Sequence, residues 1–184
     1  MLGIVKQLLE RRPHLAWRKT KHGTNPVERA VLDNNLDLVK IFLEFNDNLA
    51  YMKNEPKGNT LFLIAVQKGH LSIAKEIINT CPDSVYIPNK LGKNALHDAI
   101  YYEKPDIVDY ILRTPQLHRL MNQADNNGEL PLFAAANKCD PKLLRSLITH
   151  TGQDHTARNV DACHALRIVY GKKSLWNTLK WVSN

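Results

Sequence analysis

The sequence has few of the features on which disulfide-bonded and membrane proteins depend. Its 184 residues include three cysteines, Cys81, Cys139 and Cys163, and none of them belongs to a Cys-x-x-Cys pair. An odd number of widely spaced cysteines is typical of reduced thiols in the cytosol or nucleus. The sequence also has no secretory signal and no run approaching the roughly 18–20 apolar residues that span a bilayer. We therefore expect a cytoplasmic chain with no membrane helix of its own.

Motifs for catalysis and for metal or phosphate binding are absent as well. The eight histidines are scattered, without a His-x-x-x-His or His-Glu-x-x-His pattern, and no phosphate-binding glycine loop occurs. Cys163 and His164 are adjacent, so on a helix they point about 100° apart and poorly share one metal ion. Asp106 and Asp109 fall on a predicted solvated helix surface. We expect no catalytic residue, no metal, no cofactor and no small-molecule substrate; a reactive Cys163 beside His164 is the enzymatic alternative.

The charge is mildly unbalanced toward basic residues. Lysine and arginine number 25 against 18 aspartates and glutamates, for a net charge of +7 and a pI near 9.3. Hydrophobic residues make up 43% of the chain, which is enough for a packed core. Basic residues cluster toward both ends: Arg11, Arg12, Arg18, Lys19 and Lys21, then Lys172, Lys173 and Lys180. Without a known nucleic-acid motif, these clusters make nucleic-acid binding the alternative to protein binding rather than the first expectation.

What the sequence does contain is an internal repeat. Four glycines recur at intervals of 35, 34 and 36 residues: Gly23, Gly58, Gly92 and Gly128. An alanine follows each glycine at position +7, and apolar pairs follow at +15/+16 and +19/+20. The alanines are Ala30, Ala65, Ala99 and Ala135. The same frame finds apolar pairs at both ends of the chain: Ile4 and Val5, Leu8 and Leu9, then Trp181 and Val182.

This spacing predicts a stack of helix–turn–helix units. Positions +4, +7 and +8 share one face of a short first helix, and the two apolar pairs form one stripe on a second helix. Each glycine marks a tight turn of positive φ, and Pro26 and Pro131 stand in the first turn of a helix. Because each unit leaves apolar surface uncovered, the units must stack on one another.

The repeat resembles the ankyrin repeat. The segments that carry the resemblance are Gly58-Asn-Thr-Leu-Phe-Leu-Ile-Ala-Val-Gln-Lys-Gly-His70 and Gly92-Lys-Asn-Ala-Leu-His97-Asp-Ala. The tetratricopeptide repeat has a similar period, but its tryptophan, glycine and tyrosine pattern is missing. The resemblance implies an all-α ankyrin-repeat solenoid with short hairpin turns, which binds proteins and has no enzymatic activity. It also implies that the histidine at +5 bonds backbone groups between units; only His97 keeps it.

A narrower resemblance points to plant ankyrin proteins that carry a membrane domain after the repeats and are linked to immunity. It rests on Cys81-Pro-Asp-Ser, on Asn89-Lys-Leu-Gly-Lys-Asn-Ala-Leu-His97 and on Leu112-Arg-Thr-Pro-Gln-Leu. It implies a role in plant immune signalling or as the target of a pathogen effector. Because the membrane segment is absent from these 184 residues, the resemblance also implies one of three origins: a fragment of a longer protein held on the cytoplasmic face of a membrane, a truncated relative, or a repeat domain grafted elsewhere.

The frame divides the chain into one array. We expect the second helix of a truncated repeat at 1–19, repeats at 20–53, 54–88, 89–123 and 124–157, and a degenerate capping repeat at 158–184. The last unit has Ala162 in place of the glycine, and Trp176 and Trp181 give it a large apolar surface that suits either a cap or a partner-binding end. Trp17, Tyr51 and Tyr86 share a place after the second helix, as a packed ladder or as a recognition stripe.

The turn tips and the first helices should line a continuous concave surface. The residues we expect to bind a partner there are Lys57, Asn59, Gln67, Lys90, Leu91, Lys93, Asp98, Tyr101, Tyr102 and Asn137. Rigid aromatic side chains and cations coincide around Tyr101 and Tyr102, a combination that is common at the centres of interfaces. The alternative is that Tyr101 packs on the neighbouring repeat. The predicted partner is a protein with an acidic or mixed surface.

Overall fold

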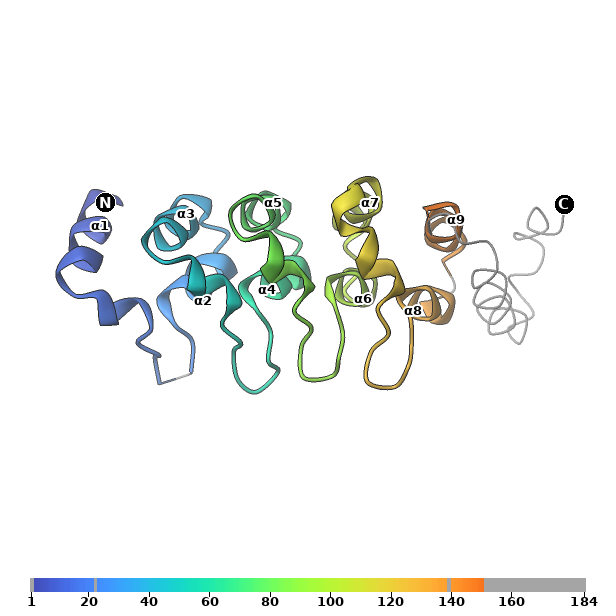
Figure 1. The fold of residues 1–184 in the computed structure, drawn as a ribbon, viewed down its shortest axis with the longest axis horizontal. Helices are drawn as coiled ribbons and strands as arrows, with labels where there is room; N and C mark the ends of the chain where they lie inside the picture. Colours follow the sequence, from blue (N-terminus) through green and yellow to red (C-terminus); the bar gives the residue numbers. More distant parts are fainter. Residues whose placement is uncertain (1, 22, 139, 151–184) are drawn as a thin grey trace, which may run out of the picture.

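The chain folds into a row of paired helices, seen in a computed structural model that describes residues 2–21, 23–138 and 140–150 (Figure 1). The α-helices are α1 (Leu2–Arg11), α2 (Pro26–Leu32), α3 (Leu36–Phe45), α4 (Leu61–Lys68), α5 (Leu71–Thr80), α6 (Ala95–Tyr101), α7 (Pro105–Arg113), α8 (Pro131–Lys138) and α9 (Pro141–His150). Short 3-10 helices follow the longer ones: η1 (Pro13–Ala16), η2 (Asp47–Tyr51), η3 (Pro82–Tyr86) and η4 (Pro115–Asn122). These residues contain no strand, which confirms the predicted all-α solenoid.

The helices form two parallel rows. Helices α1, α3, α5, α7 and α9 lie in one row, and α2, α4, α6 and α8 lie in a second row, beyond which the connecting turns project (Figure 1). Helices of consecutive units therefore pack side by side, α2 against α4, α4 against α6 and α6 against α8. This arrangement buries the apolar face that each unit leaves open, as the period predicted.

Polar caps set where the first helices begin. The side-chain oxygens of Asn25 and Asn94 accept hydrogen bonds from the backbone N–H three residues later, at 2.8 and 3.2 Å. Thr60 caps α4 in the same way. These bonds satisfy backbone donors that a helix start leaves without a partner. The polar residue after each glycine-containing turn is therefore a start signal that the local sequence encodes.

Residues of positive φ form the turn before the first helix of each unit and, in three units, the turn after it. The four frame glycines have φ between 72° and 78°, which confirms the predicted tight turns. The first helix then passes into the second through a left-handed residue in three units: Asn34 (φ 54°), Gly69 (φ 81°) and Glu103 (φ 56°). Glycine adopts this conformation without steric cost, whereas Glu103 does so at a cost of roughly 1–2 kcal/mol.

The core is one continuous layer between the two rows. The alanines at +7 are all buried, which lets the paired helices approach closely. Large side chains of the second helices fill the space between units: Phe42, Ile77, Ile111 and Leu147. Full burial of such a side chain stabilises a fold by roughly 1.5–3 kcal/mol. From α2 onward, most of the frame positions that are apolar in the sequence are thus buried in the stack.

Neighbouring turns are joined by backbone hydrogen bonds. The N–H of Lys90 donates to the carbonyl of Lys57, and the N–H of Asn126 donates to the carbonyl of Leu91, both at 3.1 Å. Each turn is also closed internally: Asn89 Oδ1 accepts from the N–H groups of Leu91 and Lys93. The turn tips are therefore fixed relative to one another, so that side chains on them are presented in a defined order.

The first described helix packs on one side only. Helix α1 lies beside α3, with Leu9 buried, while Ile4 is 68% exposed and Leu8 47% exposed. The ring of Trp17 meets that of Phe45 edge-on, with centroids 6.1 Å apart. Trp17 is therefore a packing residue, as the ladder interpretation predicts. The expected capping repeat at 158–184, with Cys163, His164, Trp176 and Trp181, lies outside the described residues, and the division into repeats stays a prediction.

The connection before the fourth glycine is longer than the others. Its 3-10 helix η4 has eight residues, whereas η2 and η3 have five each. Tyr86, at the end of η3, donates its hydroxyl to the carbonyl of Gln116, and the guanidinium of Arg119 lies 5.3 Å from the Tyr86 ring centroid. The inserted residues thus pack on the preceding unit.

Candidate partner-binding surface

The expected binding residues converge on one hollow between the second and third described turns. The hollow has a volume of about 370 Å³, and we call it the Tyr101 hollow. Eight of the ten predicted residues line it: Lys57, Gln67, Lys90, Leu91, Lys93, Asp98, Tyr101 and Tyr102. Asn137 is exposed on α8 and is not part of its lining. Pro56 and Asn89 complete the lining; neither stands among the ten, and Asn89 acts mainly as a turn-closing residue.

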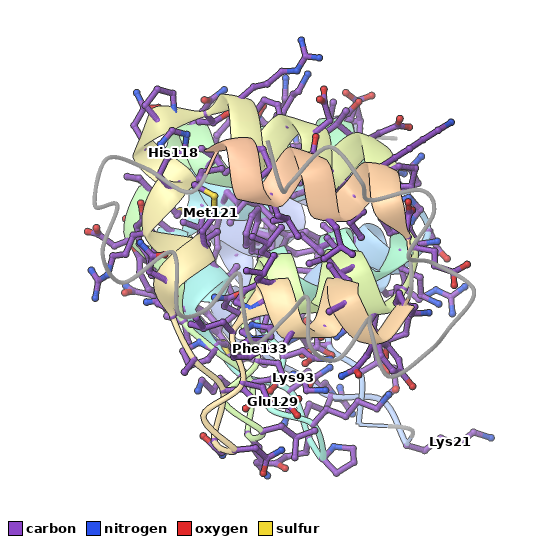
Figure 2. All side chains as sticks on the ribbon, turned by 90° about the vertical axis from the view of Figure 1, so that its right-hand side faces the viewer. Lys21, Lys93, His118, Met121, Glu129 and Phe133 are labelled. Atoms are coloured by element: carbon purple, nitrogen blue, oxygen red, sulfur yellow. The ribbon has the colours of Figure 1, made fainter. Side chains whose placement is uncertain are left out.

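The hollow lies on the turn side of the stack. In the view along the row, Lys93 and Glu129 are both drawn on the turn side of the stack, below Phe133 of α8 (Figure 2). His118 and Met121, both from η4, are drawn level with the helices and away from the turns, and Met121 is buried in the core (Figure 2). The turn positions and the connection after the second helix therefore lie on different faces of the stack, as the repeat frame indicated.

Two of the ten residues are not surface residues, and this corrects the expectation for them. Asn59 and Asp98 are each only 3% exposed. Asn59 Nδ2 donates to Gln67 Oε1 at 3.2 Å, and Gln67 Nε2 donates to Asp98 Oδ2 at 2.8 Å. The three side chains thus form a polar chain under the surface, because each is paired with the next rather than with water. Asn59, at position +1 of its unit, and Asp98, at position +6, therefore lie in the seam between units, whereas the sequence frame placed both on the open face.

Asp98 is the titratable member of the polar chain formed by Asn59, Gln67 and Asp98. Burial raises the pKa of its carboxyl to about 6, and three weaker effects oppose that shift: the hydrogen bond from Gln67 and the charges of Lys93 and Lys57. A buried carboxylate is unfavourable unless it is hydrogen-bonded or paired. A group that titrates near neutral pH in a hollow is a candidate for function.

Tyr101 is the most prominent side chain of the surface. It is 58% exposed, so it does not pack into the neighbouring unit. Its ring is flanked by two ammonium groups, Lys93 Nζ at 5.5 Å and Lys138 Nζ at 5.6 Å from the centroid, and the ring of Tyr102 meets it edge-on at 5.0 Å. Lys138 was not among the ten predicted residues. It stands at +10 of the fourth unit, the frame position of Tyr102, so the repeat frame could have predicted it as a surface residue.

The lysines around the hollow differ in their pairing. Lys90 pairs with Glu55, and Lys138 pairs with Glu103 at 2.8 Å. These ammonium groups lower the pKa of Glu55 and of Glu103. Among the residues that the structure describes, no carboxylate lies within ion-pair distance of Lys57 or Lys93. These two ammonium groups are therefore the ones open to a charge on a partner.

His97 holds the third turn to the fourth. Its Nδ1 accepts from the N–H of Asn94 at 3.3 Å, so its Nε2 carries the proton and donates to the carbonyl of Glu129 at 2.9 Å. Burial is the main cause that lowers the pKa of His97. This bond between units is the one that the ankyrin resemblance implied. It keeps the turns on either side of Tyr101 in a fixed relation.

A larger hollow of about 610 Å³ lies between α6–α7 and α8–α9. Its apolar lining includes Ile100, Val108 and Leu112, which are buried core residues between units. It lacks an exposed aromatic side chain, so we consider the smaller Tyr101 hollow the better candidate. Within the described ranges there is no cluster of three histidine, cysteine or acidic side chains placed to hold a metal ion. None of the helices described there has both the length and the apolar character that crossing a bilayer requires.

Comparisons with known proteins agree on the fold. A family model for ankyrin repeats in three copies matches residues 27–119 and 62–159, which together exceed half of the chain. Among solved structures, 286 chains match, and one is the crystal structure of the ankyrin repeat domain of Bcl-3, described as a unique member of the IkappaB protein family. It shares 16% identity at a TM-score of 0.69; the match covers 82% of this chain and 65% of that one. The likeness therefore concerns the fold. A search of the curated proteins finds no match.

Proposed function

Because the chain belongs to the ankyrin-repeat family, we propose that it is a protein-binding module whose partner docks on the Tyr101 hollow and the adjoining turns. Ankyrin repeats generally mediate protein–protein interaction, and the scaffold is generally non-enzymatic. The observation that carries the proposal is the exposed ring of Tyr101 between the ammonium groups of Lys93 and Lys138. A fixed, exposed aromatic ring beside cations is the type of residue that dominates binding energy at interfaces.

The partner surface that fits is acidic or mixed. Lys57 and Lys93 carry charges that no described carboxylate pairs, and Leu91 adds an apolar side chain that is 62% exposed. A partner that brings a carboxylate and an apolar side chain to this place would match both. Rim charges of this kind mainly raise the rate of association and make it sensitive to salt.

The test compares chain variants that share one fold. Full-length partners are captured from cells of the source organism with the wild type, with Tyr101→Ala and with Lys57→Glu/Lys93→Glu. Tyr51→Ala is the matched control, because Tyr51 is also exposed but stands on η2, outside the hollow. We expect the first two variants to lose a partner that the control retains, with affinity reduced about 30-fold for Tyr101→Ala. A partner set that is identical for all variants would refute the proposal.

We further propose that the module serves plant immune signalling, or is the target of a pathogen effector, on the cytoplasmic face of a membrane. The support is the resemblance of three segments to membrane-anchored plant ankyrin proteins: 81–84, 89–97 and 112–117. The second of these segments lies at the Tyr101 hollow, so its resemblance and the proposed binding surface coincide. Fractionation of source cells with an antibody against residues 2–150 tests this, and a parent protein confined to the soluble fraction would count against it.

Nucleic acid is the alternative ligand. The five basic residues between Arg11 and Lys21 are all exposed, which leaves them open to phosphate groups. A titration of the chain with random duplex DNA at 50 and 200 mM salt separates the two functions. Binding that falls by about a hundredfold or more over this range would favour the nucleic-acid function.

A further inference from the structure

We propose that the Tyr101 hollow receives a carboxylate side chain of the partner, and that seating this acid is coupled to the uptake of one proton by Asp98. The inference rests on the proposed function and adds the chemical class of the anchoring group and its dependence on pH. Three features carry it: the charge of the lining, the position of Asp98, and the polar chain behind Asp98.

The lining has an excess of positive charge. Lys57, Lys90 and Lys93 border the hollow, and of these only Lys90 is paired with a described carboxylate, that of Glu55. Asp98 is the single acidic residue of the lining. With Asp98 ionised, two unpaired ammonium groups face one carboxylate, and with Asp98 protonated they face none. An incoming acid is therefore favoured by the lysines and, among the residues of the lining, opposed only by Asp98.

Charged and polar groups lie near Asp98 on several of the elements that pack around the hollow, and Gln67, Lys93 and Lys57 act on it directly. Helix α4 supplies the neutral amide of Gln67, the turn before α4 supplies Lys57, and the turn before α6 supplies Lys90 and Lys93. Tyr101 and Tyr102 follow on its own helix. Helix α8 contributes Lys138, which is paired with Glu103. Because the cations already act on Asp98, a second carboxylate near them competes for the same charges and drives Asp98 toward its protonated form.

The polar chain behind Asp98 accommodates that proton. With Asp98 ionised, Asn59 Nδ2 donates to Gln67 Oε1 and Gln67 Nε2 donates to Asp98. When Asp98 is protonated, both amides can turn over, so that the Asp98 hydroxyl donates to Gln67 Oε1 and Gln67 Nε2 donates to Asn59 Oδ1. Asn59 Oδ1 is buried and accepts no hydrogen bond in the described structure. The reversal supplies this atom with a donor, while Asn59 Nδ2 gives up Gln67 Oε1 as its acceptor. It needs no additional space, since amide oxygen and nitrogen are nearly the same size.

The coupling has a direction that separates acidic from basic ligands. Burial already raises the pKa of Asp98 to about 6 in the free chain. An acid that raises it further binds more tightly as the pH falls, by up to about 20-fold between pH 7.5 and pH 5.5. A lysine or arginine in the hollow would instead pair with ionised Asp98, and its binding would weaken over the same range.

The experiment starts from a random library of 12-residue peptides selected on the whole chain at pH 5.5. Peptides that also bind Lys57→Glu/Lys93→Glu are removed. We expect the retained peptides to contain aspartate or glutamate, and one of them, made with blocked ends and free of histidine, is measured by calorimetry at pH 5.5 and 7.5 at one ionic strength. A matched peptide with glutamine or asparagine in place of the acid controls for the carboxylate, and should bind weakly at both pH values.

Asp98→Asn is the decisive variant, because it retains an oxygen for Gln67 and cannot titrate. We expect it to bind the acidic peptide at pH 7.5 about as tightly as the wild type does at pH 5.5, with no pH dependence. Carboxyl carbon NMR of Asp98 in the wild type should show a higher pKa with peptide than without. Basic retained peptides, wild-type affinity that is equal at the two pH values, or a pH dependence that persists in Asp98→Asn would each overturn the inference.

The outcomes also separate the inference from the proposed function. Peptides that bind the hollow, as judged by loss of affinity in Tyr101→Ala, but show no pH dependence would overturn the coupling and leave the binding surface standing. A library that yields no peptide sensitive to Tyr101→Ala or to the double lysine change would overturn both.

Discussion

The amide of Gln67, on α4, donates a 2.8 Å hydrogen bond to the carboxylate of Asp98, on α6. This bond joins the first helices of two consecutive units and continues the polar chain that begins at Asn59. It also connects stability with binding, because Asp98 forms part of the lining of the Tyr101 hollow.

Asp98→Asn should stabilise the chain at pH 7. The pKa of Asp98 is raised from 3.8 to about 6 in the folded chain, so the unfolded state releases its proton first as the pH rises. As the pH rises from about 4 to about 6, the free energy of unfolding of the wild type therefore falls, and at pH 7 the loss has reached up to about 3 kcal/mol. Urea unfolding at pH 3.5 and pH 7 measures it: the variant should equal the wild type at the lower pH and exceed it at the higher. A variant that is less stable at pH 7 would show that the ionised carboxylate supports the fold.

Gly92→Ala should be much more damaging than Gly128→Ala. Both glycines have the same backbone conformation, with φ of 76° and 78°, so each alanine bears a similar conformational cost of roughly 1–2 kcal/mol. A Cβ at position 92 would also lie 2.5 Å from the backbone nitrogen of Asn126, whereas a Cβ at position 128 meets nothing within 4 Å. We expect Gly92→Ala to cost roughly 2 kcal/mol more than Gly128→Ala. Thermal or urea unfolding of the two variants gives the comparison, and equal losses would mean that the turns can separate.

His97→Leu should destabilise the stack by roughly 1–3 kcal/mol at pH 7.5, because it removes the bonds to Asn94 and Glu129. Leucine is the natural residue at the same frame position of the second unit, Leu63, so the side chain fits this type of site. The pKa of His97 is lowered from 6.5. As the pH falls below 6.5 the unfolded state takes up a proton first, and the wild type loses this part of its stability.

The difference between wild type and His97→Leu should therefore shrink from pH 7.5 to pH 5. Asp98 contributes equally to both proteins at each pH, so it cancels in the difference. His14→Leu, at an exposed histidine of η1, is the control and should show a difference near zero at both pH values. A gap that widens on acidification would contradict the direction of the shift.

Trp17→Ala should lower stability, whereas Tyr51→Ala should change it little. Trp17 packs edge-on against Phe45 and against the core, and removing a large packed ring costs about 2–4 kcal/mol. Tyr51 occupies the corresponding place in the next unit but is exposed. Unfolding midpoints of the two variants give the comparison. Equal, small effects would revive the interpretation of these aromatic residues as a recognition stripe.

The period of the glycines, alanines and apolar pairs was sufficient to predict the fold. Positive φ at the four frame glycines and the burial of the +7 alanines agree with expectations from residue identity and spacing. The bond from His97 to the next turn agrees with what the ankyrin resemblance implied. The physical reason is that contacts in a solenoid are local: each unit touches only its neighbours, so a single period specifies the packing of all units.

The same period was less reliable for the binding surface. It located Lys57, Leu91, Lys93 and Tyr101 on one face, because turn tips and helix positions repeat with the frame. It placed Asn59 and Asp98 on the open face, although both are buried in the seam between units. Burial there depends on how closely one unit approaches the next, and that distance is a property of the assembled stack.

The sequence by itself therefore determined the units, their turns and the face on which side chains gather, since these follow from backbone preferences and apolar periodicity. Only the tertiary structure decided which lysines remain unpaired and which carboxyl is withdrawn from water. Pairing and desolvation depend on residues that are 31 and 35 positions apart in the chain, as with Gln67 and Asp98 and with Glu55 and Lys90. Charge interactions depend on distances of a few ångströms between atoms, and no local sequence pattern specifies the distance between two such residues that accurately.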